Sequence, residues 1–148
     1  MQMRFDGFIG FPGGLIDPTD KTWEDGLNRE LKEELNLNEK FYIDKSDYLF
    51  SSLNESRNIV LHFYAKKVTY EDFRAIELDS MNAEDFGSEV MGVIRPPLYQ
   101  MPNGRGLSIF LSNEFAGNSL IQFLKSLLNL GLLSSTEILD AIKNTDKQ

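Results

Sequence analysis

The chain of 148 residues contains no cysteine. It can therefore form no disulfide and has no thiol nucleophile, as is common for proteins of reducing compartments. No apolar run approaches the length that a bilayer span needs, and the opening residues MQMRFD lack the apolar stretch of a secretory signal. We expect a protein that is not secreted and that has no membrane partner.

Positive charge is scarce as well. The sequence has 15 Lys and Arg residues against 23 Asp and Glu residues, so its net charge is −8. This balance argues against loose, charge-driven binding of nucleic acid, but it allows an RNA end held by a metal ion and a local basic patch. The candidates for such a patch, with ordinary surface solvation as the alternative for each, are Lys66, Lys67, Arg95 and Arg105.

The length suffices for a substantial core, and we expect one domain over residues 1–148. Turn-forming residues between two apolar runs predict a hairpin with strands at about 47–53 and 59–67. Capping signals predict a helix over about 69–78 and another that starts at 118 or 119. A strand over 89–95 and a short helix after Ser134 complete the expected elements.

The most informative stretch runs from Phe11 to Leu37 and combines a glycine pair, an acidic loop and a helix expected over about 23–35. Thr22 can cap the helix start, with Asp25 capping back, and Asn36 suits the end because asparagine tolerates the left-handed conformation. Apolar residues recur every four positions and predict a buried stripe of Trp23, Leu27, Leu31 and Leu35.

Three carboxylates, those of Glu30, Glu33 and Glu34, share a neighbouring face of the expected helix. Because they repel each other, all three can stay ionised at low free-energy cost only around a cation. Hard oxygen ligands of this kind suit Mg²⁺ or Mn²⁺. The alternative is a solvated acidic face on a surface helix. The Gly13-Gly14 turn favours the metal site, because it lets the backbone come close and the Gly13 carbonyl could join the ligands.

The stretch resembles the Nudix box, G-x5-E-x7-R-E-U-x-E-E-x-G-U. Its second half is matched by Arg29, Glu30, Leu31, Glu33, Glu34 and Leu37. One extra residue separates Gly14 from Arg29, so Lys21 stands where the box has its first Glu, with Asp20 and Glu24 nearby. Asn36 replaces the glycine of the second half.

Flanking segments narrow the resemblance to the Nudix subgroup of small-nucleolar-RNA-decapping and inosine-diphosphate-hydrolysing enzymes. These segments are RFDG at 4–7, GFPGG at 10–14, EDGLNRE at 24–30, HFYAK at 62–66, PLY at 97–99 and GLL at 131–133. The resemblance implies an α/β (α+β) fold with a mixed β-sheet between helices, in which the family's N-terminal strands are missing. It also implies a possible homodimer and a nuclear (nucleolar and nucleoplasmic) or cytoplasmic location.

The implied reaction is metal-dependent hydrolysis of a pyrophosphate bond in a nucleoside diphosphate derivative. The implied partners are a nucleoside diphosphate, such as inosine or deoxyinosine diphosphate, and the 5′ end of a capped small nucleolar RNA. The same broad group includes relatives that bind RNA or protein without hydrolysis, so a binding module is the alternative function. The three carboxylates and Arg29 are all present here, and this favours the enzyme.

Several residues receive roles from these arguments. Glu33 or Glu34 is the expected base or metal ligand, and Arg29 can orient Glu33 from one helical turn away. The expected metal ligands are Gly13, Glu30, Glu33, Glu34 and, from the resemblance, Glu89, for which a strand-end surface carboxylate is the alternative.

The expected substrate contacts are Arg4, Phe11 and Gln122. Phe11 could stack on a base or belong to the core, and Gln122, whose role comes from the resemblance, could contact the base or lie exposed on its helix. For His62, the only histidine, a packed or hydrogen-bonded structural role is preferred over a catalytic one.

Overall fold

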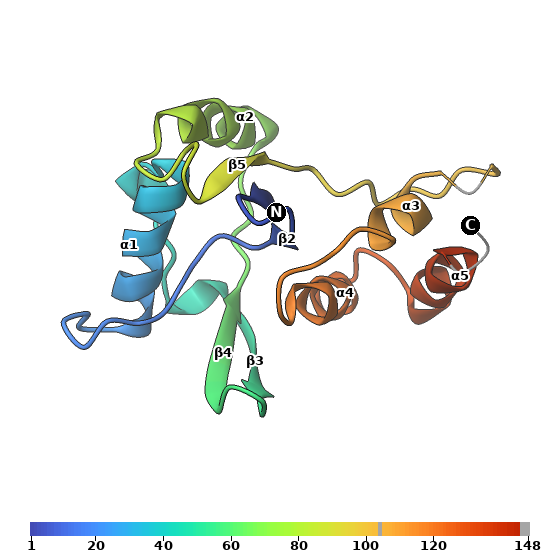
Figure 1. Ribbon diagram of the computed structural model, residues 1–148, viewed down its shortest axis with the longest axis horizontal. Helices are drawn as coiled ribbons and strands as arrows, with labels where there is room; N and C mark the ends of the chain where they lie inside the picture. The colour runs from blue at the N-terminus through green and yellow to red at the C-terminus, as the bar shows by residue number, and fades with distance from the viewer. Residues whose placement is uncertain (104, 146–148) are drawn as a thin grey trace.

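The computed structural model describes residues 1–103 and 105–145. Its helices and strands, in chain order, are β1 (Gln2–Arg4), β2 (Ile9–Gly10), α1 (Trp23–Leu35), β3 (Tyr48–Asn54), β4 (Ile59–Tyr64), α2 (Tyr70–Asp79), β5 (Val90–Val93), α3 (Leu107–Leu111), α4 (Ser119–Asn129) and α5 (Ser135–Thr145). Short 3₁₀ helices lie at Glu39–Phe41, Lys45–Asp47 and Ser80–Asn82. Figure 1 shows α1 on one side of the strands, α2 above them, and α3, α4 and α5 grouped on the opposite side.

The strands form two separate antiparallel ladders. β1 lies between β2 and β5, with Gln2 opposite both Gly10 and Val93. β3 and β4 form the predicted hairpin, whose turn carries Asn58 with a φ of 52° that asparagine tolerates better than most residues. Helices combined with antiparallel strands confirm the α+β class. Within the described residues, the expected mixed sheet is divided between these two ladders.

The helix α1 begins and ends as predicted. The hydroxyl of Thr22 accepts a hydrogen bond from the Asp25 N–H at 3.0 Å, which satisfies one of the unpaired donors of the first turn. Asn36 follows the last turn with a φ of 50°, and the Leu37 N–H reaches back to the Leu31 carbonyl at 3.2 Å. Only this half of the expected capping box is present. Among the described residues, the Asp25 side chain makes no hydrogen bond to the Thr22 backbone.

Two apolar clusters hold the molecule together. The first joins the C-terminal helices to β2 and buries Ile9, Leu107, Phe110, Leu111, Phe123, Leu127, Ile138 and Ala141. The second lies under α1 and buries Leu31, Leu37 and Phe41. In the described part of the chain, no helix is both long enough and apolar enough to cross a membrane.

The expected stripe of α1 is buried only in part. Leu31 is 6% exposed, whereas Trp23 at the start of the helix is 54% exposed. The prediction that Trp23 is buried is therefore wrong. The second cluster packs against the middle and end of α1, so the first turn extends beyond it.

Candidate functional site

Arg29 lies at the centre of an ionic cluster on α1. Its Nη1 donates hydrogen bonds to Glu30 Oε1 at 2.8 Å and to Glu33 Oε2 at 3.2 Å. Its Nη2 donates to Asp20 Oδ2 at 3.3 Å and to the Leu15 carbonyl at 3.2 Å. The planar guanidinium can serve several oxygens at once, so Arg29 connects the loop before α1 to two of the helix carboxylates.

Asp20 is the residue of the preceding loop whose side chain pairs with Arg29. In the sequence, Lys21 stands where the box has its first Glu, with Asp20 and Glu24 nearby. Of these three residues, only Asp20 contacts Arg29. The Arg29 guanidinium, helped by the Asp17 N–H, holds the pKa of Asp20 below its usual range. Glu24 instead accepts a hydrogen bond from a tyrosine of β4.

Glu34 differs from the other two carboxylates because it is buried, with an exposed fraction of 5%. Its Oε1 accepts from Gln2 Nε2 at 2.9 Å, and its Oε2 accepts from the Gly13 N–H at 2.7 Å. Burial raises the pKa of Glu34 from 4.5 to about 7, despite these two hydrogen bonds, and the charges of Glu30 and Asp85 act in the same direction. Sequence reasoning missed Gln2, although a polar residue between two methionines of a strand is a usable signal.

The glycine pair fits closely against the helix. Gly13 has a φ of 125°, a backbone conformation that residues with a side chain rarely adopt. A Cβ at Gly14 would lie 2.3 Å from Glu30 Oε2, well inside van der Waals contact. The backbone of the turn therefore lies so close to the Glu30 carboxylate that, with the carboxylate in this position, only glycine fits at residue 14.

The donor set fits a divalent cation in its chemistry. The three glutamates offer hard oxygen ligands, and the backbone of the glycine turn lies against Glu30 and Glu34, to which it presents the Gly13 N–H. Their present arrangement is not a completed site: in residues 1–103 and 105–145, no three His, Asp or Glu side chains are grouped so that they could hold one ion. Glu30 and Glu33 face Arg29 instead, so an ion would compete with the guanidinium for these two carboxylates.

Asp85 is an acidic residue outside the box that sequence reasoning did not single out, and it lies beside this cluster. Its N–H donates to the Glu33 carbonyl at 3.0 Å, and its charge acts on Glu34. Glu89 lies directly before β5, where its carbonyl accepts from the Phe5 N–H at 3.0 Å and its side chain is exposed. The role of Glu89 as a metal ligand stays a prediction. Asp85 was missed because its loop has no periodic pattern.

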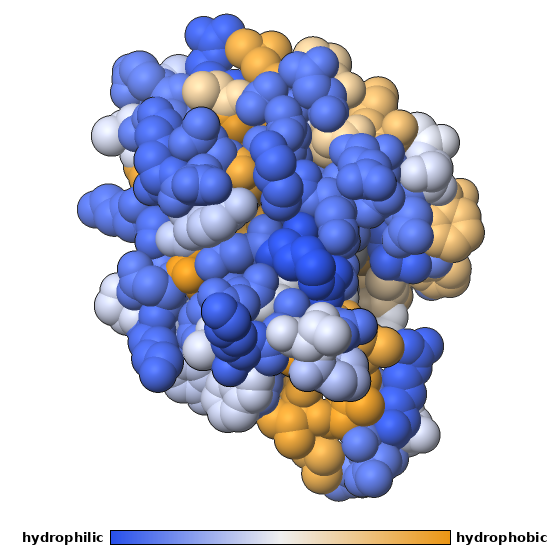
Figure 2. Space-filling model, turned by 90° about the vertical axis from the view of Figure 1, so that its left-hand side faces the viewer, coloured by the Kyte–Doolittle hydropathy of each residue, from blue (hydrophilic) through white to orange (hydrophobic). Residues whose placement is uncertain are grey.

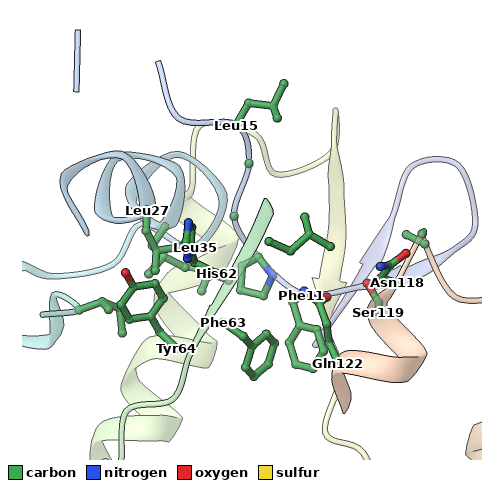
Figure 3. A pocket seen from close by; sticks show the side chains of 18 of the residues that line it. Phe11, Leu15, Leu27, Leu35, His62, Phe63, Tyr64, Asn118, Ser119 and Gln122 are labelled. Carbon is green, nitrogen blue, oxygen red and sulfur yellow. The ribbon is translucent and has the colours of Figure 1, made fainter. Parts of the chain in front are cut away.

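A cleft of about 850 Å³ extends from α1 across the hairpin to the start of α4. Arg4, Phe11 and Gln122, the three predicted substrate contacts, all line it. Figure 3 shows Phe11 and Gln122 on one side of the cleft, opposite the side formed by α1. Phe11 packs edge-on against Phe63 at 4.7 Å between ring centroids, and Arg4 pairs with Asp6 at 3.1 Å. Phe11 thus both supports the core and presents a ring to the cleft.

His62 is packed and hydrogen-bonded, in agreement with the structural interpretation. Its Nδ1 lies 2.7 Å from the Ser51 hydroxyl, and its ring stacks on Trp23 with 4.0 Å between centroids. It also lines the cleft, so its structural role places it beside any bound ligand.

Two of the four candidate basic residues form ion pairs with acidic neighbours. Lys66 lines the cleft but pairs with Asp47, and Arg95 pairs with Glu77 on α2. Figure 2 shows a largely hydrophilic face over α1, with an apolar area at its lower end, where the hairpin lies. Leu53 and Val60 of that hairpin are each 57% exposed.

Known proteins are similar in sequence to most of this chain. A family model described as Nudt16-like, U8 snoRNA-decapping enzyme-like, matches residues 1–133. The chain belongs to this family. The U8 snoRNA-decapping enzyme of Mus musculus is 47% identical over 135 residues, which cover 90% of the chain and 69% of that relative. The enzyme of the same name from Xenopus laevis is 44% identical over 146 residues, covering 97% of the chain and 69% of the relative.

A second kind of relative aligns with an equally large part of the chain. The Tudor-interacting repair regulator protein of Homo sapiens is 39% identical over 151 residues, which cover 100% of the chain and 70% of that protein. The U8 snoRNA-decapping enzyme-like family is a Nudix subgroup, so the resemblance found in residues 11–37 is confirmed. Within it, relatives that are named for an enzyme and for protein binding both align with most of this chain.

Proposed function

We propose that the protein is a hydrolase that cleaves a pyrophosphate bond in a nucleoside diphosphate derivative. The candidate substrates are the 5′ end of capped small nucleolar RNA and inosine or deoxyinosine diphosphate. The observation that carries the proposal is the cluster around Arg29, which binds the carboxylates of Asp20, Glu30 and Glu33 next to a glycine turn that lines a large cleft. The names of the decapping relatives support the RNA substrate.

The residues of α1 would have different roles in the reaction. Mg²⁺ or Mn²⁺ held by Glu30, Glu33, Glu34 and the Gly13 carbonyl, with Glu89 as a further candidate ligand, would neutralise phosphate charge and lower the pKa of a bound water. Arg29 orients Glu33 through a bond of 3.2 Å, and Glu33 keeps part of its side chain exposed. We favour Glu33 over Glu34 as the base, because the Glu34 oxygens are buried and already accept from Gln2 and Gly13.

The wall of the cleft would hold the nucleoside. The ring of Phe11 offers a stacking surface, and the amide of Gln122 can donate and accept along the edge of a base. Arg4 would contact phosphate or base after exchanging its bond to Asp6. A possible homodimer, one domain over residues 1–148 and a nuclear or cytoplasmic location are proposals that rest on the family resemblance.

The test is to incubate the protein with inosine diphosphate or a capped RNA, with Mn²⁺ or with a chelator, and to measure released phosphate or cap nucleotide. We expect metal-dependent product, and we expect Glu33→Gln to lower turnover by about 10²-fold, as for loss of one preorganised charged group. Near-normal turnover by Glu33→Gln would remove Glu33 from its proposed role.

A binding module is the second candidate function. It is favoured by the match to Tudor-interacting relatives along the whole chain and by the exposed apolar side chains of the hairpin. Retention of RNA or of a protein partner in a pull-down, without metal-dependent product from either substrate, would select this function over hydrolysis.

A further inference from the structure

Trp23 occupies an unusual position for a tryptophan. It is the first residue of α1 and 54% exposed, although the stripe to which it belongs is buried at Leu31. Leaving more than half of such a large ring in water forgoes much of the stabilisation that its burial would give. Trp23 also lines the cleft, so part of its surface borders the space where a ligand would lie.

One face of the indole is already covered. The imidazole of His62 stacks on it with 4.0 Å between centroids and 15° between the ring planes. The imidazole is itself fixed by the Ser51 hydroxyl, 2.7 Å from its Nδ1. The pair therefore presents one flat aromatic surface, which is backed by β4 and open on the indole side.

This surface is held rigidly between two elements. Glu24, next to Trp23 on α1, accepts a hydrogen bond from the Tyr64 hydroxyl of β4 at 2.9 Å. The Ser51 hydroxyl that holds His62 also lies 2.9 Å from the Tyr48 hydroxyl. A ring that is already ordered in the free protein loses little conformational entropy when a ligand stacks on it.

The cleft contains a second aromatic surface at a different place. Phe63, the neighbour of His62 on β4, supports Phe11, which faces the cleft from the end of β2. One strand thus backs two aromatic platforms, one next to Gln122 and one at the start of α1. With about 850 Å³, the cleft lies near the upper end of the roughly 300–1,000 Å³ of small-molecule pockets, which leaves room for more than one ring system.

We propose that Trp23, backed by His62, is a stacking platform for a nucleobase of the RNA chain beyond the nucleotide that carries the cleaved phosphate. The proposal rests on the proposed hydrolase function and makes capped RNA, rather than a free nucleoside diphosphate, the substrate that uses the whole cleft. Stacking tolerates any base, since every base has a π-face, so the platform adds affinity without sequence preference. Arg57 of the hairpin turn, which has no ion-pair partner among the described residues, lines the same cleft and suits the adjoining phosphate.

The chain supplies its own probe, because Trp23 is its only tryptophan. The Glu33→Gln variant, in Mg²⁺ so that RNA is bound but consumed slowly, is titrated with a capped oligonucleotide and separately with inosine diphosphate. Stacking of a base on the indole quenches its fluorescence. We expect saturable quenching by the oligonucleotide and little change with inosine diphosphate. Quenching by neither ligand, or equal quenching by both, would overturn the proposal.

Kinetics on the otherwise native chain give the second readout. Base stacking on an aromatic residue contributes about 1–3 kcal/mol. Trp23→Ala should therefore lower kcat/KM for capped RNA by roughly 5- to 150-fold and leave kcat/KM for inosine diphosphate unchanged. Trp23→Phe should restore most of the loss. The matched control is Tyr70→Ala, because Tyr70 is also the first residue of a helix and 61% exposed but does not line the cleft.

The possible outcomes separate the two proposals. Equal losses for both substrates in Trp23→Ala, or no loss for either, would contradict the platform while leaving hydrolysis intact. Absence of turnover in the native protein would contradict hydrolysis, and the fluorescence titration would still decide whether RNA stacks on Trp23. If a protein partner quenches the indole and capped RNA does not, the platform serves protein binding and the RNA proposal fails.

Discussion

The buried carboxyl of Glu34 allows a quantitative test of the site in the absence of any ligand. In the Glu34→Gln variant, an amide replaces the carboxyl group and can still accept from the Gly13 N–H. The amide resembles the protonated carboxyl in shape and charge but cannot ionise. The difference in unfolding free energy between the native chain and this variant therefore isolates the ionisation of Glu34.

The magnitude follows from the pKa. Burial raises the pKa of Glu34 from 4.5 to about 7, so the folded chain binds this proton more tightly than the unfolded chain does. The folded state consequently loses stability, relative to the variant, as the pH rises from 4.5 to 7, and the loss is complete above that range. At about 1.4 kcal/mol per unit of pKa shift, the total reaches roughly 3 kcal/mol.

The assay is urea unfolding, followed by circular dichroism, at several pH values from 5 to 8 in the presence of a chelator. We expect the native chain to lose roughly 2.5 kcal/mol against Glu34→Gln over this range, with most of the loss below pH 7. Added Mg²⁺ should recover part of the loss at pH 8 in the native chain but not in the variant, because a cation next to Glu34 favours its ionised form. Parallel stability curves for the two proteins would show that Glu34 ionises normally and would refute this account of its burial.

Two further predictions concern the partners of the helix. Gly14→Ala would place a Cβ within 2.3 Å of Glu30 Oε2, so we expect it to displace that carboxylate and lower metal-dependent turnover by roughly 10-fold or more, with unchanged turnover as the contrary result. Asp20→Asn weakens the hold on Arg29 and should lower turnover by about 10-fold, whereas Asp25→Asn, which removes the same charge without a bond to Arg29, should leave it unchanged. Equal turnover in the Asp20 and Asp25 variants would show that the Asp20 contact has no role in the reaction.

The sequence predicted the parts of the fold that local signals control. The bounds of α1 follow from the Thr22 cap and from Asn36, and the hairpin follows from its turn composition. The helix that starts after Thr69 was found in the same way. In contrast, α3 was not predicted, because the five residues Leu107–Leu111 are too few to show a helical period.

The candidate site was predictable in its residues but not in its contacts. The glutamate spacing placed three carboxylates on one helix, yet the burial of Glu34 depends on Gln2, which lies 32 positions away in the sequence. The choice of Asp20 as the partner of Arg29 depends on the path of the loop, which has no periodic pattern to reveal it. The exposure of Trp23 depends on where the cluster under α1 ends.

The central claim, that the α1 carboxylates bind a divalent cation, is tested most directly by electron paramagnetic resonance of Mn²⁺. Free Mn²⁺ gives a strong six-line signal that weakens when the ion binds to protein, so titration counts bound ions without any substrate. We predict that the native chain removes this signal saturably and that a variant with Gln at positions 30, 33 and 34 does not, while Glu77→Gln on α2, outside the cluster, binds as the native chain does. Equal Mn²⁺ binding by the native chain and the triple variant would contradict the claim.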